Sequence, residues 1–388
     1  MTDSLPLVVV APDSFKGSCD SVAAASALAR GVRQALGETV RIRELPLADG
    51  GEGTLDALTT AWGGTVRTAP TTDALGRPRD GRFGLSADGR TAIIEAAEAN
   101  GLPHVSDVAP QPLGADTRGV GLLALAALGA GATEILLCVG GSATNDGGAG
   151  LLVALGARLL DSAGNELAPG PRGLAQLDRV DLTGLSPAAR AARWRVAVDV
   201  DNPLTGPRGA AAVFGPQKGA TPDDIVAIDA ALGRFARVLA PDAGLESRAG
   251  LGAAGGLPLA LVAVLGAEVT PGADLVARAV GLDAALAEAA LVITGEGRLD
   301  AQSLDGKVLS RILSGVRRGT PVLAVVGSLA LSARECRAAG LTAALSIAQG
   351  PATLDELTPR TPELLAEAAA QACALVGARL PARGLPLD

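Results

Sequence analysis

Apolar runs and helix-spaced apolar positions alternate at both ends of the chain. Residues 7–11 form a continuous apolar run, and residues 18–36 then repeat apolar side chains at helical spacing, with Ser18 as the expected cap. Residues 40–47 favour a second strand and residues 53–61 a second helix. Towards the other end, strands are predicted at 291–294, 321–326 and 343–347, and helices at 306–317 and 361–380. This alternation is typical of a parallel sheet covered by helices.

The middle of the chain follows a different pattern. Short β segments at 65–72, 81–85 and 91–95 are joined by turn sequences such as Asp88-Gly89, which favour antiparallel or mixed pairing. Helices are predicted at 119–128 and 221–239, with a strand at 194–200. We therefore predict an α/β protein in which a discontinuous Rossmann/flavodoxin-like parallel-sheet domain (residues 1–68 plus 288–388) carries a large inserted mixed α/β domain (residues 69–287).

Composition and charge narrow the class of protein. A chain of 388 residues with 48% hydrophobic and 19% charged residues is expected to fold into compact domains, and its length favours two. The net charge is −8, and no run of Lys and Arg is present that could neutralise phosphates. Nucleic acid is therefore not an expected partner.

The cysteines and apolar segments bear on the compartment. Cys19, Cys138, Cys336 and Cys373 show no C-x-x-C spacing, so we expect reduced and mostly buried thiols. No basic segment precedes the first apolar run, and no apolar run reaches the ~18 residues of a membrane span. We expect a cytoplasmic protein with no membrane partner. A homodimer is one option for the oligomeric state, which the sequence leaves open.

A glycine-rich loop at residues 140–150 follows the apolar run 135–139 and precedes a helix expected from about residue 151. Gly140 and Gly141 lack side chains, so their backbone N–H groups can approach an anion closely. Ser142, Thr144 and Asn145 add short polar groups, and the helix N-terminus adds the positive end of a dipole. A lone loop of this kind is equally consistent with an ordinary strand-to-helix turn.

Four further segments combine acidic residues with glycines directly after predicted strands, at residues 12–18, 48–54, 201–206 and 295–300. Any one of them is typical of a turn capped by Asp. Together with the glycine loop they favour a metal–phosphate site, because carboxylates bind Mg²⁺ and open backbone binds phosphate oxygens. In folds of this class, ligands bind beyond the carboxyl ends of parallel strands, and a cleft between domains is a common place for a site.

Residue chemistry suggests separate roles within that site. Lysine can place a point charge on a phosphate, and arginine can grip a carboxylate through two hydrogen bonds. His104 is the single histidine and is expected at the surface, so a carboxylate is the expected general base. A solvated surface position is the alternative for Lys16. The predicted roles are catalysis by Asp13, Lys16 and Asp199, phosphate or nucleotide binding by Gly140, Gly141, Ser142, Thr144, Asn145 and Lys218, substrate binding by Ser14, Arg118 and Arg298, and metal binding by Asp49, Glu52, Asp201, Glu296 and Asp300.

Seven sequence blocks together resemble the bacterial glycerate kinase family of type I. They are APDSFKGS (11–18), LADGGEGT (47–54), GGSATNDGGAG (140–150), DVDNPL (199–204), FGPQKGA (214–220), GAAGGL (252–257) and TGEGRLDAQSLDG (294–306), and the likeness runs in order from about residue 6 to 380. The resemblance implies ATP-dependent phosphorylation of D-glycerate at its 2-hydroxyl, giving 2-phosphoglycerate and ADP, with Mg²⁺ as cofactor. It also implies two α/β domains, one of them discontinuous.

Three alternatives stay open beside this reading. One is a kinase that forms 3-phosphoglycerate, and another is a kinase for a related hydroxy acid such as tartronate or erythronate. The third is a sugar-acid sensor that kept the cleft and lost phosphoryl transfer. The sensor is disfavoured because Asp13, Asp49, Asp199, Asp201, Glu296 and Asp300 are all present. The residues alone decide neither the hydroxyl that is phosphorylated, nor the catalytic base, nor the domain that binds adenine.

Overall fold

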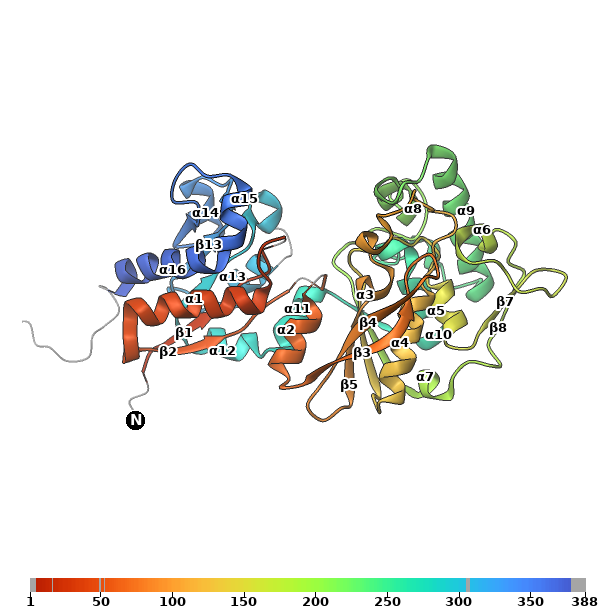
Figure 1. Cartoon of the computed structure of the whole chain (residues 1–388), viewed down its shortest axis with the longest axis horizontal. Coiled ribbons are helices and arrows are strands. Elements are labelled where there is room, and N and C mark those ends of the chain that lie inside the picture. The colour runs from red at the N-terminus through yellow and green to blue at the C-terminus, as the bar shows by residue number, and fades with distance from the viewer. Residues whose placement is uncertain (1–4, 16, 49, 52, 305–307, 378–388) are drawn as a thin grey trace, which may run out of the picture. The chain divides into compact units, whose positions relative to one another are not determined.

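The computed structural model of the chain describes residues 5–377, apart from residues 16, 49, 52 and 305–307. The chain divides into two compact units, one made of Met1–Asp49 with Val276–Asp388 and the other of Gly50–Leu275 (Figure 1). We call them the discontinuous unit and the inserted unit. Residues 50–68, expected in the discontinuous domain, lie in the inserted unit, and residues 276–287 lie in the discontinuous unit.

The discontinuous unit is built on a five-stranded sheet in the order β15-β13-β11-β1-β2, and its pairings are parallel. The strands are β1 (Leu7–Val10), β2 (Arg41–Glu44), β11 (Ala289–Thr294), β13 (Val322–Val326) and β15 (Ala343–Ser346). Counted along the chain, this is the order 2-1-3-4-5 of flavodoxin-like folds, so the predicted fold class is confirmed. The strand order reverses between β1 and β11, which makes that point the topological switch point of the sheet.

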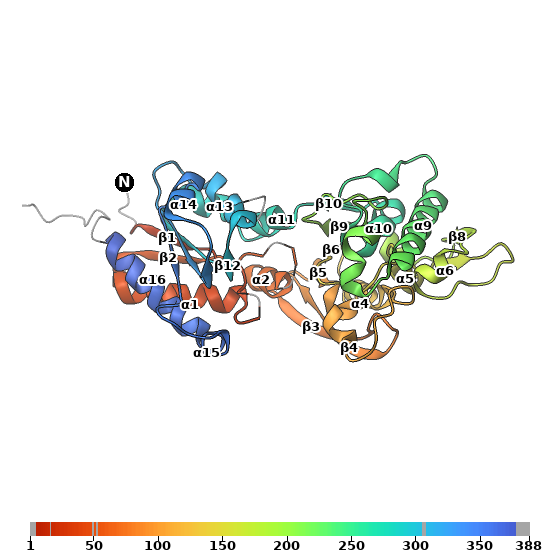
Figure 2. The same ribbon diagram turned by 90° about the horizontal axis from the view of Figure 1, so that it is seen from above.

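Helices cover both faces of this sheet (Figure 2). α1 (Ser21–Leu36) and α16 (Thr361–Gly377) pack side by side on one face, and α13 (Val308–Gly315) and α14 (Ala333–Ala339) lie on the other. A Cβ at Gly31 of α1 would lie 2.1 Å from the Ala366 carbonyl oxygen, so glycine permits this close approach. The cap of α1 differs from the expected one. Asp20 accepts from Ala23 N at 2.7 Å, whereas the Ser18 hydroxyl donates to the Phe15 carbonyl.

The inserted unit contains a six-stranded mixed sheet in the order β10-β9-β6-β5-β4-β3. The strands are β3 (Thr65–Thr72), β4 (Pro78–Leu85), β5 (Thr91–Glu95), β6 (Glu134–Cys138), β9 (Arg193–Ala197) and β10 (Glu268–Thr270). β3, β4 and β5 pair antiparallel, and β5, β6, β9 and β10 pair parallel. The mixed pairing expected for the middle of the chain is therefore confirmed. The carboxyl ends of the four parallel strands form one edge.

The sheet of the inserted unit is packed mainly with Ala, Leu and Val, as the near absence of aromatic residues requires. The helix α9 begins with Thr221 and Asp224 in a capping box and with Pro222 at its first position, which are strong helix-start signals. The helices of this unit are α2 (Thr54–Ala61), α3 (Ala97–Asn100), α4 (Arg118–Gly129), α5 (Ala149–Ala154), α6 (Gly170–Leu174), α7 (Pro187–Ala191), α8 (Ala210–Phe214), α9 (Pro222–Leu239) and α10 (Pro258–Leu265). The unit ends at Leu275 within α11 (Gly272–Ala279), whose remaining residues belong to the discontinuous unit.

Smaller elements complete the two units. β7 (Arg158–Leu160) and β8 (Arg179–Asp181) form a short antiparallel ribbon, and β12 (Arg298–Leu299) pairs in parallel with β14 (Ser328–Leu329). The discontinuous unit also contains α12 (Leu282–Glu288) and α15 (Leu354–Leu357). Cys138, Cys336 and Cys373 are buried. Within the part of the chain that the structure describes, no helix combines the length and apolar character needed to cross a membrane.

Candidate functional site

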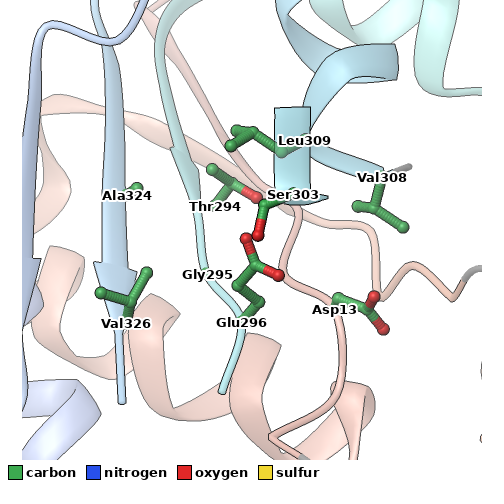
Figure 3. Close-up of a pocket in the computed structure, with 9 residues that line it drawn as sticks. All are labelled: Asp13, Thr294, Gly295, Glu296, Ser303, Val308, Leu309, Ala324 and Val326. Carbon is green, nitrogen blue, oxygen red and sulfur yellow. The ribbon is translucent and has the colours of Figure 1, made fainter. Parts of the chain in front are cut away.

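The switch point of the discontinuous unit brings together acidic residues that follow two strands. Asp13 follows β1 and Glu296 follows β11, and both line one small pocket with Thr294 and Ser303 (Figure 3). Asp13 N donates to the Gly295 carbonyl at 2.8 Å, which holds the two strand ends together. In the close-up, the Glu296 carboxylate lies towards the Ser303 hydroxyl. Two half-buried carboxyl groups are thus fixed at the place where folds of this class bind ligands.

This pocket has the donor chemistry of a hard cation site. Carboxylate oxygens from Asp13 and Glu296 occur beside the hydroxyls of Thr294 and Ser303. Mg²⁺ commonly binds through one or two protein carboxylates and completes its shell with waters and substrate phosphates. Among the described residues no three His, Cys, Asp or Glu side chains form a metal-binding group. The residues present therefore fit Mg²⁺ held jointly with a phosphate ligand.

The other predicted metal ligands are spread over the chain. In the discontinuous unit, Asp300 forms an ion pair with Arg298, in which Oδ2 lies 3.2 Å from Nε. Asp201 belongs to the inserted unit, where its exposed carboxylate pairs with Arg208 at 3.0 Å. Asp49 and Glu52 lie outside the described residues. The described part of the structure therefore gathers Asp13 with Glu296, and it places Asp201 in the other unit.

Loops at the carboxyl edge of the second sheet converge within the inserted unit. A Cβ at Gly140, after β6, would lie 3.0 Å from Gly51 Cα. A Cβ at Gly50 would lie 2.9 Å from Gly272 Cα and 3.0 Å from an Asp199 carboxylate oxygen. Asp199 follows β9 and accepts a hydrogen bond from Gly272 N at 2.8 Å. Close backbone packing that excludes side chains thus positions the exposed Asp199 carboxylate beside the glycine segments.

Glu95 also belongs to this edge, and it is not among the predicted site residues. It ends β5, pairs in register with Cys138 of β6, and accepts from Leu55 N in the first turn of α2 at 2.7 Å. Burial raises the pKa of its carboxyl group to about 7. Glu95 therefore anchors the helix that follows the glycine segment 50–53 to the sheet. An acidic residue at the end of an otherwise apolar strand was the signal available in the sequence.

Lys218 forms the centre of a buried polar cluster. Its Nζ donates to the Thr144 carbonyl at 2.6 Å, and the Ser142 hydroxyl and Asn145 Oδ1 each lie at 3.3 Å. No described carboxylate lies within ion-pair distance of this ammonium group, and burial lowers the Lys218 pKa to about 7. Asn100 donates to the Thr144 hydroxyl at 3.0 Å. A cation held only by neutral oxygens suits an anionic ligand.

The start of α5 is satisfied from within the protein. The fully buried Asp146 accepts from Gly150 N at 2.9 Å, Gly148 N at 3.2 Å and both the amide and hydroxyl of Thr117 at 2.9 Å. α5 has only six residues. The expected contribution of this helix N-terminus to anion binding is therefore wrong, because Asp146 already uses its amide groups. The exposed amides of Gly140 and Gly141 form no hydrogen bond with a described residue and stay open to a ligand.

The remaining predicted site residues occupy separate positions. Ser14 N donates to the Asp13 carboxylate at 2.6 Å, next to the switch-point pocket. Arg298 is 70% exposed in the discontinuous unit. Arg118 begins α4 in the inserted unit, where it lines a 360 Å³ pocket with Asp116. Lys16 lies outside the described residues. The two arginines thus occur on different units.

Comparison with known proteins gives a consistent result over almost the whole chain. A sequence profile of the glycerate kinase family matches residues 8–377. The glycerate kinase of Bacillus subtilis (strain 168) is 43% identical over 352 residues, which cover 90% of this chain and 92% of the relative. The glycerate 2-kinase of Escherichia coli (strain K12) is 42% identical over 352 residues with the same coverage.

A solved structure agrees with these sequence relatives. The crystal structure of a putative glycerate kinase 2 from Salmonella typhimurium LT2 superposes with a TM-score of 0.87 at 42% identity. The match covers 97% of this chain and 99% of that chain. The match therefore spans both units.

Proposed function

Because the chain belongs to the glycerate kinase family, we propose that it transfers the γ-phosphoryl group of ATP to the 2-hydroxyl of D-glycerate, giving 2-phosphoglycerate and ADP. The observation that carries this proposal is the 42% identity to a glycerate 2-kinase over 90% of the chain. The glycine loops and carboxylates at the two sheet edges supply the groups that phosphoryl transfer requires. The chain is accordingly a kinase, and its alcohol acceptor is the small acid glycerate.

In the inserted unit, we assign phosphate binding to the glycine loop. The amides of Gly140 and Gly141 are exposed, so they can donate to phosphate oxygens. Ser142, Thr144 and Asn145 orient this loop through their contacts with Lys218. The ammonium group of Lys218 brings positive charge to the loop, and its buried setting strengthens its interaction with an anion.

In the discontinuous unit, we assign Mg²⁺ binding to the switch-point pocket. Glu296 would hold the ion, with Asp13 beside it and Asp300 in the same segment. A bound Mg²⁺ neutralises charge on the phosphate oxygens during transfer. Asp49, Glu52 and Asp201 remain further candidates for the same role. Ser14, Arg118 and Arg298 remain candidates for gripping the substrate carboxylate, for which a charged side chain with several donors is suited.

A carboxylate is proposed to take the proton from the substrate hydroxyl. Asp199 is exposed and accepts a hydrogen bond from Gly272 N, which fixes its carboxylate at the sheet edge as the candidate general base. Asp13 is the second candidate, since it is half-buried at a strand end. Lys16, which follows in the same segment, is proposed to neutralise charge on the phosphate. Glu95 acts through the helix it anchors and is a positioning residue.

Steady-state assays with a panel of acids test this function. ADP formation should require both Mg²⁺ and D-glycerate, and chelation of the metal should abolish it. L-glycerate, tartronate and erythronate, each at the same concentration, serve as controls for substrate identity. ADP formation with D-glycerate that never exceeds the rate without acid would refute the kinase. A higher kcat/KM for tartronate or erythronate would reassign the acceptor.

A further inference from the structure

A pocket of 470 Å³ lies within the inserted unit and is not explained by phosphate or glycerate binding. Its walls are mainly apolar and come from the 3-10 helix Leu102–Val105, the following segment to Ala115, and Ala143 of the glycine loop. Ala115 and Ala143 belong to a separate small apolar cluster of this unit. The volume lies in the range of small-molecule sites, which combine apolar walls with a few polar groups.

The wall of this pocket is tied directly to the glycine loop. Leu102 N donates to the Gly141 carbonyl at 3.0 Å, and Ala143 N donates to the Asn100 carbonyl at 2.8 Å. These two bonds pair the segments in a short antiparallel bridge. The pocket wall and the phosphate-binding loop are therefore hydrogen-bonded neighbours, and Ala143 of the loop lines the pocket.

Four polar residues interrupt the apolar lining, and the hydroxyl of one of them, Ser106, donates to the Pro103 carbonyl. Gln111 and Gln217 are exposed, and their carboxamides form no hydrogen bond with a described residue. Lys218 also lines the pocket, and its side chain is only 4% exposed. A carboxamide can pair with the N6 and N7 edge of adenine, and the ammonium group favours a phosphate. Apolar walls, two carboxamides and a buried cation together match an adenine nucleotide.

Glycerate does not suit this pocket. It is a three-carbon acid with two hydroxyls that would leave most of the 470 Å³ unfilled, and the mainly apolar walls would cost it hydration. A planar purine, in contrast, gains from burial against Leu75, Leu102 and Val105. We propose that this pocket binds the adenine base of ATP, with Gln111 or Gln217 reading its polar edge. This proposal rests on the proposed kinase function and assigns the base to the inserted unit.

Two matched valine substitutions test the assignment. Val108 lines the pocket and is 40% exposed, whereas Val213 of α8 is 44% exposed and lines none of the described pockets. Val108→Glu should raise the KM for ATP and the inhibition constant of adenosine at least about tenfold, because a carboxylate replaces an apolar contact. The KM for D-glycerate should stay within about twofold. Val213→Glu, which adds the same charge, should leave all three constants within about twofold.

Adenosine is uncharged, so its binding separates loss of the base contact from repulsion between Glu and phosphate. Gln111→Ala and Gln217→Ala provide a second measure. At least one of these variants should lower the affinity for adenosine about fivefold more than it lowers the affinity for inosine. Photolysis with 8-azido-ATP should label the peptide that contains residues 102–111. The proposal is overturned if folded Val108→Glu keeps wild-type constants for ATP and adenosine, if labelling is confined to other peptides, or if Val108→Glu only alters the oligomeric mass by light scattering.

Measurements of adenosine binding also distinguish failure of this proposal from failure of the proposed function. Calorimetry of wild type, Val108→Glu and Val213→Glu with adenosine needs no turnover. Suppose that wild type does not phosphorylate D-glycerate, but that it binds adenosine and only Val108→Glu loses this binding. That result would refute the kinase and support the pocket. An active kinase whose adenosine affinity is unchanged in Val108→Glu would support the kinase and refute the pocket.

Discussion

The carboxyl edges of the two sheets differ in how they hold charge. At the edge of the five-stranded sheet, Asp13 and Glu296 are half-buried. At the edge of the six-stranded sheet, Asp199 is exposed, whereas Glu95 and Lys218 of the same unit are buried. Among the residues that the structure describes, every buried charged side chain belongs to the inserted unit. Burying a charge costs free energy unless it is compensated, so the buried charges lower the stability of this unit. The same burial holds their side chains in fixed positions.

This difference separates substitutions into two kinds. Changes at half-buried or exposed acids should reduce catalysis while the fold survives, because surface interactions contribute little to stability. Changes at the buried Glu95 and Lys218 should alter stability as well, because they leave buried polar partners without a hydrogen bond or remove a charge whose burial costs free energy.

Asp199→Asn should give the largest loss of activity with little loss of stability. The amide keeps the shape and can still accept from Gly272 N, but it cannot take up a proton. A general base contributes about 10²–10⁴-fold, so kcat should fall by about a thousandfold while the melting temperature changes by no more than about 2 °C. Steady-state kinetics and thermal melting measure both. Asp181→Asn, at the end of β8 in the same unit, is the control, and unaltered kcat in Asp199→Asn would exclude Asp199 as the base.

Lys218→Met should lower both activity and stability. Loss of the ammonium group leaves the Thr144 carbonyl and the Asn145 side chain without their buried donor, which costs about 1–3 kcal/mol. Loss of its charge should lower kcat/KM for ATP by about a hundredfold. Urea unfolding and kinetics on the same preparation give the two values. A variant of lower stability but wild-type kcat/KM would make Lys218 purely structural.

Glu296→Gln should weaken metal use without affecting the fold. The amide removes one negative charge from the switch-point pocket, so the Mg²⁺ concentration for half-maximal activity should rise by about 10–100-fold, and high Mg²⁺ should restore much of the rate. Glu288→Gln, on the same unit and exposed, should behave as wild type. A reduced rate that no concentration of Mg²⁺ improves would remove Glu296 from the metal site.

Glu95→Gln should raise stability in a pH-dependent way. The pKa of Glu95 lies near 7 in the folded protein, above the usual 4.5. Between pH 4.5 and 7 the native state therefore binds more protons at this group than the unfolded chain does, and the native protein loses stability as pH rises through this range. Gln keeps an acceptor for Leu55 N without the buried charge. Relative to wild type, the variant should gain on the order of 2–3 kcal/mol at pH 8 and little at pH 4.5. Urea unfolding at the two pH values checks this, and a gap that is independent of pH contradicts it.

The sequence predicted the layout of the fold well, because apolar runs and helix-spaced positions are local signals. Both sheets and the acids that follow their strands were accessible in this way. Contacts between distant residues were not, since Lys218 lies 73 residues from Asn145 and Glu95 lies 40 residues from Leu55. The role of Asp146 was missed for the same reason, because its partner Thr117 lies 29 residues away.

Residue usage held a further signal. The chain has 33 Lys and Arg residues, but only Lys16, Lys218 and Lys307 are lysines, and each lies within or next to a motif block. In a chain that otherwise uses arginine, a lysine indicates a position that needs a compact positive charge or a side chain whose pKa can shift. The boundaries between the two units could not be derived, because they depend on packing and not on local pattern.

The position of the transferred phosphoryl group is the most direct test of the central claim. Wild-type protein with Mg²⁺, ATP and D-glycerate should yield a product that phosphorus NMR identifies as 2-phosphoglycerate. Enolase should convert it to phosphoenolpyruvate without added phosphoglycerate mutase, in amounts equal to the ADP formed. Phosphoenolpyruvate that appears only after the mutase is added would place the phosphate on the 3-hydroxyl and contradict the account.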